Sequence, residues 1–254
     1  MNLLDYPFVL SGICFLALWL SAQAGAWTRK RRDEPTETER QDLGVVLGAT
    51  LTLLALVIGF SFSMATSRYD QRKNYEEAEA NAIGTEYVRA DVLPADDANS
   101  VRLLLKSYLR QRILFYTARD PGQVKAISET TSRLQNDLWS IVQRHCDAQP
   151  TAVSALVLSG MNDVLNAQGY TQAAWWNRIP VGAWVLMIAV GIFGDGLFGY
   201  NAHREGKTAL FIALPLIVSA ALFVLADMDS PRRGLIRVHP QNLESLAETL
   251  AVKK

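Results

Sequence analysis

The stretch from Leu43 to Thr66 reads LGVVLGATLTLLALVIGFSFSMAT, and no charged residue occurs between Asp42 and Arg68. A helix needs about 20 apolar residues to cross a bilayer, so this run predicts a transmembrane helix. Three glycines and five hydroxyl side chains interrupt it: Gly44, Gly48, Gly59, Thr50, Thr52, Ser61, Ser63 and Thr66. Because small residues let helices approach closely in lipid, we expect this helix to pack against other helices or to line a passage.

Three further apolar runs occupy residues 8–27, 179–200 and 208–226. The first run contains Ala22-Gln23-Ala24, which resembles a signal-peptidase site. The residues before the run contain no Lys or Arg, although a secretory signal needs basic residues there. We therefore expect the first run to be retained as a transmembrane helix, which gives four spans in all.

The overall composition fits membrane spans combined with water-facing helices. Half of the 254 residues are hydrophobic and a fifth are charged. The 25 basic and 25 acidic residues balance, so the basic excess of a nucleic-acid-binding protein is missing. Cys14 and Cys146 form neither a disulfide framework nor a C-x-x-C zinc motif, and we expect no cofactor and no metal.

Residues 67–178 contain no spanning run and predict four amphipathic helices, because apolar residues recur every three or four positions. Pro94, the turn Asp120-Pro121-Gly122 and Pro150 separate these helices. The expected core positions are Ala80, Ile83, Tyr87, Ala90, Val101, Leu104, Leu105, Tyr108, Phe115, Ile127, Leu134, Leu138, Ile141, His145, Val153, Leu156, Val157 and Val164. A further short amphipathic helix is expected from Gln241 to Val252.

These elements predict an all-α membrane protein in which a soluble domain of four helices is inserted between two pairs of transmembrane helices. The expected divisions are residues 1–66 for the first two spans, 67–178 for the soluble domain, 179–227 for the last two spans and 228–254 for a polar tail. Short hairpins make the spans of each pair antiparallel neighbours. The soluble domain and the tail must then lie on the same side of the membrane.

The basic residues beside the spans do not decide which side this is. The flanks facing the soluble domain carry Arg68, Arg72, Lys73, Arg178, Arg232, Arg233 and Arg237, and the opposite flanks carry Arg29, Lys30, Arg31, Arg32, Arg40, Arg204 and Lys207. The counts are equal, and weighting the first helix most would place the soluble domain outside. The run Arg29–Arg32 is a topology determinant or a binding site for anionic lipid.

The chain contains none of the hydrolase, nucleotide-binding or metalloprotease motifs we sought, and no nucleophile–base pair, so we do not expect an enzyme. His145 on an apolar stripe is a core residue or a titrating group. Asp195 lies inside the third span, where a carboxylate is costly, and it either has a functional role or reaches the membrane interface.

Two patterns, one after the second span and one within it, each allow a structural and a functional interpretation. The acidic residues Glu76, Glu77, Glu79 and Glu86 form a solvated helix face or a ring of charge at the mouth of a pore. Within the span, a stripe of residues four apart serves helix packing or forms a hydrophobic constriction: Gly48, Thr52, Leu56, Phe60 and Met64.

The same span carries a resemblance to a family of ion channels. Ile58-Gly59-Phe60 followed by Thr66-Ser67-Arg68-Tyr69-Asp70-Gln71 resembles the pore helix of bestrophins, which has Leu-Gly-Phe-Tyr-Val and then Thr-Arg-Trp-Trp-Asn-Gln. Two other segments resemble a bacterial family described as bestrophin-like: Glu79-Ala80-Asn81-Ala82-Ile83-Gly84 and Asp229-Ser230-Pro231-Arg232-Arg233-Gly234-Leu235-Ile236-Arg237-Val238. This second resemblance covers nearly the whole chain and the layout of two plus two spans.

The resemblance implies a pentameric channel in the bacterial inner membrane, with the soluble domain in the cytoplasm and other copies of the chain, membrane lipids and an ion of either sign as partners. The positions that match the bestrophin neck are Thr52, Leu56 and Phe60, and Thr52 departs from the apolar pattern. We place Met64, Arg68 and Glu76 at the inner mouth. Asp227 and Asp229 are too few for the calcium site of animal bestrophins, because calcium takes about six to eight oxygen ligands. The alternative is a non-conducting membrane scaffold or sensor whose soluble domain binds a partner.

Overall fold

The computed structural model describes residues 3–31, 36–202 and 208–252, and the regular elements in these ranges are all helical. The α-helices are α1 (Pro7–Lys30), α2 (Glu37–Arg89), α3 (Ala95–Thr117), α4 (Pro121–Ala148), α5 (Ala152–Trp176), α6 (Val181–Asn201), α7 (Thr208–Asp229) and α8 (Gln241–Val252). Short 3-10 helices cover Leu3–Asp5 and Ala90–Val92. The prediction of an all-α protein is confirmed. His203 and the flanking cations Arg32, Arg204 and Lys207 lie outside the described residues.

The chain forms two compact units. The membrane unit contains residues 1–68 and 178–236, and the soluble unit contains residues 69–177 and 237–254. Helix α2 contributes its first part to one unit and its last part to the other. We expected a span and a separate soluble helix here, but the structure has one helix of 53 residues. No proline interrupts the sequence from Glu37 to Arg89, so nothing local ends the helix at the end of the span.

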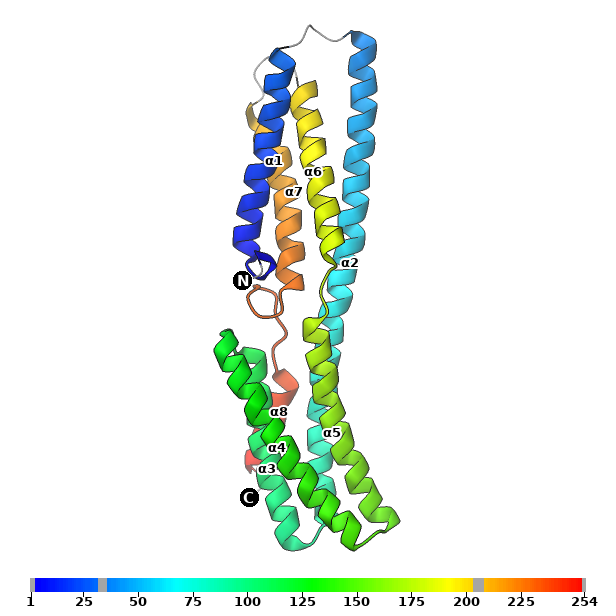
Figure 1. Ribbon diagram of the computed structural model, residues 1–254, viewed down its shortest axis with the longest axis vertical. Helices are drawn as coiled ribbons and strands as arrows, with labels where there is room; N and C mark the ends of the chain where they lie inside the picture. The colour runs from blue at the N-terminus through cyan, green and yellow to red at the C-terminus, as the bar shows by residue number, and fades with distance from the viewer. Residues whose placement is uncertain (1–2, 32–35, 203–207, 253–254) are drawn as a thin grey trace. The chain divides into compact units, whose positions relative to one another are not determined.

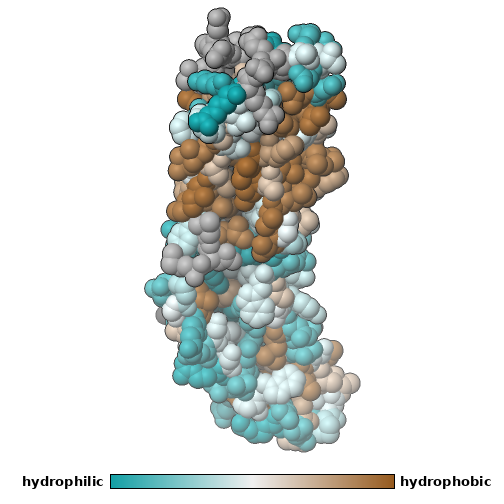
Figure 2. All heavy atoms as spheres, turned by 45° about the horizontal axis from the view of Figure 1, so that its top comes forward, coloured by the Kyte–Doolittle hydropathy of each residue, from teal (hydrophilic) through white to brown (hydrophobic). Residues whose placement is uncertain are grey.

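Four helical segments of the described chain are long and apolar enough to cross a membrane, as expected: Pro7–Lys30, Glu37–Val92, Ala152–Asn201 and Phe211–Asp229. In the membrane unit, α1 packs against both α6 and α7. Helices α1 and α6 run side by side in the same direction (Figure 1). Figure 2 shows a band of hydrophobic side chains on the surface of this unit. The chain is therefore a membrane protein.

Glycine allows α1 and α6 to approach closely. A Cβ atom added to Gly25 would lie 2.1 Å from the carbonyl oxygen of Gly196, and one added to Gly199 would lie 1.9 Å from that of Ala22. Neither space can hold a methyl group. The two helices therefore touch backbone to backbone, as in other membrane helix pairs built on small residues.

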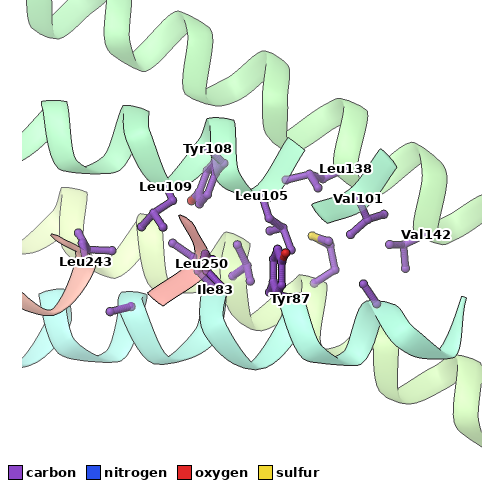
Figure 3. Close-up of a cluster of buried hydrophobic side chains, with 14 of the residues drawn as sticks. Ile83, Tyr87, Val101, Leu105, Tyr108, Leu109, Leu138, Val142, Leu243 and Leu250 are labelled. Atoms are coloured by element: carbon purple, nitrogen blue, oxygen red, sulfur yellow. The ribbon is translucent and has the colours of Figure 1, made fainter. Parts of the chain in front are cut away.

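The soluble unit surrounds one apolar core to which the end of α2 and helices α3, α4, α5 and α8 contribute (Figure 3). Most of the expected core positions are buried there, including Ile83, Val101 and Leu138. The prediction is wrong for Val153 and Leu156, which remain 51% and 58% exposed near the start of α5. Helix periodicity identified most of the buried faces but failed in the first turns of α5.

The helix boundaries follow from local capping. Asp120 accepts a hydrogen bond from the backbone N–H of Gln123, so Pro121 begins α4 instead of forming a separate turn. Thr151 and Ser154 form a reciprocal capping box that begins α5 after Pro150. Helix α8 covers Gln241–Val252, as predicted.

Candidate functional site

The surface of α2 in the membrane unit is largely uncovered by the rest of the chain. In the most apolar 18-residue stretch of α2, only 6% of the residues are buried, whereas the corresponding share in α7 is 44%. The positions that do pack inward are Leu54, Ser61 and Ala65, which recur along one side of the helix. The remaining circumference is available to lipid or to another protein surface.

The predicted constriction residues lie on this uncovered part of α2. Leu56 is 53% exposed and Phe60 is 66% exposed, and Thr52 is exposed as well. Successive residues of an α-helix differ by about 100° in direction, so Thr52, Leu56 and Phe60 follow one another along one face, turned away from Leu54. Met64 continues the stripe and is 38% exposed.

The three glycines in the membrane part of α2 face open space within the chain. A Cβ atom added to Gly44, Gly48 or Gly59 would meet no atom within 4 Å. This contrasts with Gly25 and Gly199, where the neighbouring backbone fills the space. These three glycines are therefore not explained by packing within one chain.

The hydroxyl groups of α2 are partly satisfied by the helix itself. Thr52 donates to the carbonyl oxygen of Gly48 at 2.8 Å, and Thr66 donates to that of Phe62 at 3.0 Å. Each hydroxyl oxygen can still accept a hydrogen bond. The exposed face therefore offers isolated polar atoms on an otherwise apolar surface.

Arg68, at the end of the membrane part of α2, is held close to Asp229. Its Nη1 atom lies 3.8 Å from the Asp229 carboxylate, and the Arg68 side chain is 15% exposed. Asp229 also accepts a hydrogen bond from the backbone N–H of Ile179 at 2.9 Å. Arg68 therefore has an acidic neighbour, and only part of its surface is accessible.

Glu76 is buried and holds α8 in place. Its carboxylate accepts hydrogen bonds from the side-chain amide of Asn242 at 2.6 Å and from the backbone N–H of Leu243 at 2.9 Å. A carboxylate at a helix N-terminus satisfies otherwise free N–H groups and interacts favourably with the helix dipole. In the soluble unit described by itself, Glu76 is therefore a structural anchor and does not line an open surface.

Glu79 lies at the centre of a buried polar network. It forms an ion pair with Arg112, and its second oxygen accepts hydrogen bonds from Thr171 at 3.2 Å and Tyr116 at 3.4 Å. Burial alone would lower the pKa of Arg112, but the Glu79 carboxylate raises it above its ordinary value. Burial and the same carboxylate raise the pKa of the Tyr116 hydroxyl. Arg112 and Glu79 are thus held as a charged pair.

Glu86 is fully buried, and neither carboxylate oxygen has a hydrogen-bond partner. One oxygen occupies the space beside Gly160, where an added Cβ atom would lie 2.0 Å from it. Burial raises the pKa of Glu86 to about 8; Arg89 lowers it and Asp163 raises it. A solvated acidic face is therefore the wrong interpretation for Glu76, Glu79 and Glu86, which all lie in the interior.

The raised pKa of Glu86 makes stability depend on pH. The folded protein keeps this proton up to about pH 8, whereas an exposed glutamate loses it near pH 4.5. The contribution of Glu86 is therefore complete below pH 4.5 and is lost as the pH rises to 8, by at most about 1.4 kcal/mol per pH unit. Glu86→Gln should remove this loss. The melting temperature of the variant minus that of the wild type should therefore increase from pH 5 to pH 9. Glu77→Gln, at an exposed position, is the control. If the melting temperatures of Glu86→Gln and the wild type changed with pH in the same way, the assignment would be contradicted.

The described residues contain no group of three or more His, Cys, Asp or Glu side chains that could hold a metal ion. Asp227 accepts backbone hydrogen bonds from Leu235 at 2.6 Å and Ile236 at 2.7 Å, so its oxygens already stabilise the turn after α7. His145 is buried on α4, while His239 is exposed. Asp195 is buried, and neither of its carboxylate oxygens has a hydrogen-bond partner.

The sequence analysis did not identify Arg112 or Gly160 as partners of these buried acids. Arg112 lies 33 residues from Glu79, and its predicted helix also contains Arg110, which remains exposed. The only available signal is that Arg112 follows Tyr108 by four positions and therefore shares the apolar face of α3.

Comparison with known proteins identifies a matching domain family and solved structures with the same fold. The bestrophin-like domain matches residues 9–243. Solved structures of a bacterial bestrophin homolog from Klebsiella pneumoniae share the fold. One, obtained by Zn-SAD phasing, has 13% identity and a TM-score of 0.64, with 96% of each chain covered. A variant of that homolog with one substitution has 14% identity and a TM-score of 0.63, covering 94% of this chain and 96% of that chain.

A third structure, of a membrane protein with one substitution, has 14% identity and a TM-score of 0.61, and it covers 96% of this chain and 97% of that chain. No curated protein matches the chain. Identities this low establish a common fold and nothing finer. The domain match over nearly the whole length shows that the chain belongs to the bestrophin-like family.

Proposed function

We propose that the chain is one subunit of a homo-oligomeric ion channel, with five subunits by the family resemblance, whose pore is lined by α2. The observation that carries the proposal is that a Cβ atom added to Gly44, Gly48 or Gly59 of α2 would meet no atom of the chain within 4 Å. A glycine inside a helix costs about 1 kcal/mol relative to alanine, and a lipid-facing surface gains nothing in return. Contact with other copies of α2, or with a central passage, accounts for them.

In this assembly the constriction is formed by Thr52, Leu56 and Phe60. A ring of apolar side chains gates ions by excluding water, and the Thr52 hydroxyl offers a point of hydration at one end. Met64 and Arg68 form the inner mouth. Glu76 holds α8 and does not take part in the lining, since its carboxylate is buried.

Phe60→Ala should raise the single-channel conductance of the purified protein in planar bilayers severalfold, because it removes the largest side chain of the proposed constriction. Phe62→Ala is a matched control on the same helix: Phe62 is 44% exposed and points about 160° away from Phe60. Unchanged currents in Phe60→Ala, with the protein folded and assembled, would count against this lining.

The alternative function is a non-conducting scaffold or sensor whose soluble unit binds a partner protein. Exposed apolar residues of that unit, such as Leu103 and Trp176, are compatible with such a partner. The mass of the purified chain in detergent separates the two functions. A monomer cannot enclose a passage with one α2 helix, so a monomeric mass would reject the channel.

We assign the protein to the bacterial inner membrane with the soluble unit in the cytoplasm, following the family resemblance. The balanced flanking charge leaves this orientation open to direct test. A cysteine introduced at Asp97, a partly exposed residue at the start of α3, reports the side. Its modification by an impermeant reagent in intact cells would reverse the orientation.

A further inference from the structure

A groove of about 650 Å³ lies between α1 and α6 on the surface of the membrane unit. Its volume is in the range of about 300–1,000 Å³ that is usual for ligand sites. Its walls are mostly apolar, with Ala24 of α1 and Ile192 and Phe193 of α6 exposed along it. Gly25 and Gly196 also line it, at the point where the two backbones touch. The groove is thus an apolar surface feature open to the bilayer.

One end of this groove is polar and positively charged. Thr28 and Tyr200 line that end, and the guanidinium carbon of Arg29 lies 6.0 Å from the centre of the Tyr200 ring. Helices α1 and α6 run in the same direction, so their last turns lie together (Figure 1). The last turn of α1 contributes Arg29 and Lys30.

The neighbouring side chains mark this end as the membrane interface. Trp27 is 55% exposed, and the Arg31 guanidinium carbon lies 3.6 Å from the centre of its ring. Exposed tryptophan beside basic residues is typical of the level of the lipid headgroups.

We infer that the groove binds an anionic phospholipid, with an acyl chain along Ala24 and Phe193 and the phosphate beside Arg29 and Lys30. The apolar walls suit a hydrocarbon chain, and the charged end suits a headgroup with net negative charge. Each basic residue near an anionic lipid surface contributes about a fivefold preference. This site does not depend on ion conduction and would serve the channel or the scaffold equally.

The test is native mass spectrometry of the full chain in detergent, with equal amounts of dioleoyl phosphatidylglycerol and dioleoyl phosphatidylcholine. These lipids share their acyl chains and differ in charge. The wild type should retain phosphatidylglycerol preferentially, and Arg29→Gln and Lys30→Gln should each lower this preference about fivefold. Ala24→Phe should fill the groove and lose both lipids. Gly12→Phe is the matched control, because Gly12 is exposed on the same helix, lies outside the groove and has no atom near an added Cβ.

Equal retention of the two lipids by the wild type would overturn the inference, as would full retention by Ala24→Phe. A lower oligomer mass in Ala24→Phe, with lipid retention unchanged, would show that a second copy of the chain occupies the groove. The two glutamine variants keep the test decisive if Ala24→Phe does not fold, since their substitutions lie at the charged end.

Discussion

Arg112→Met is expected to lower the free energy of unfolding of the soluble unit by about 3–5 kcal/mol, because it leaves the Glu79 carboxylate buried without its counter-charge. Arg112 is 1% exposed and Glu79 is fully buried. The Arg112 guanidinium also stacks against Phe115, with its carbon 4.5 Å from the ring centre. Thermal unfolding of the full chain in detergent measures the effect. Trp175, whose ring centre lies 5.4 Å from that of Tyr116, provides a fluorescence signal within the affected core.

Two further variants separate the loss of the ion pair from a general loss of arginine. Arg110→Met, at an exposed position on the same helix, should leave the melting temperature nearly unchanged. The double variant Glu79→Leu with Arg112→Met should recover much of the lost stability, since it removes both buried charges. If the double variant were less stable than Arg112→Met by itself, the ion pair would not be the source of the loss.

Gly199→Ala should destabilise the membrane unit by about 3 kcal/mol or more, at or above the upper end of the usual cost of overpacking. The added methyl carbon would lie 1.9 Å from the carbonyl oxygen of Ala22 and 2.7 Å from its carbonyl carbon. Both atoms belong to the backbone of α1, so no side-chain rotation can relieve the overlap. Helices α1 and α6 would have to separate, which a lower melting temperature and a lower yield of folded protein would report.

Gly182→Ala is the matched control for this change. Gly182 lies on the same helix, and an added Cβ atom would meet no atom within 4 Å. Its melting temperature should be unchanged or slightly higher, because alanine is the better helix former. Equal melting temperatures for Gly199→Ala and Gly182→Ala would show that α1 and α6 are not in backbone contact.

The buried acids show where prediction from the sequence reached its limit. Helix spacing placed Ile83 and Tyr87 correctly in the core, and the same spacing puts Glu79, Glu86 and Ala90 close to that face. Acidic residues in a row normally indicate a solvated surface, and such a surface was one of our two interpretations of them. The partners that make burial possible lie far along the chain: Asn242 is 166 residues from Glu76.

The candidate site also combines features that the sequence shows with features that only the structure shows. The apolar run, its glycines and the stripe from Thr52 to Phe60 are visible in the sequence, because they depend only on composition and helix periodicity. Only the structure shows which glycines have a neighbour. Backbone atoms occupy the space beside Gly25 and Gly199, whereas the space beside Gly48 and Gly59 is open. Identical residues on similar helices therefore have different surroundings.

The sequence by itself determined the helical class, the four spans, most of the soluble core and the limits of α8. These are local properties, decided by the length of apolar runs, by periodicity and by capping residues within a few positions. The tertiary structure alone decided that α2 continues past its span, that Glu76 anchors α8, that Glu79 pairs with Arg112 and that Asp195 is buried. The fate of a charge depends on which distant groups replace its lost water, and only the folded chain brings those groups together.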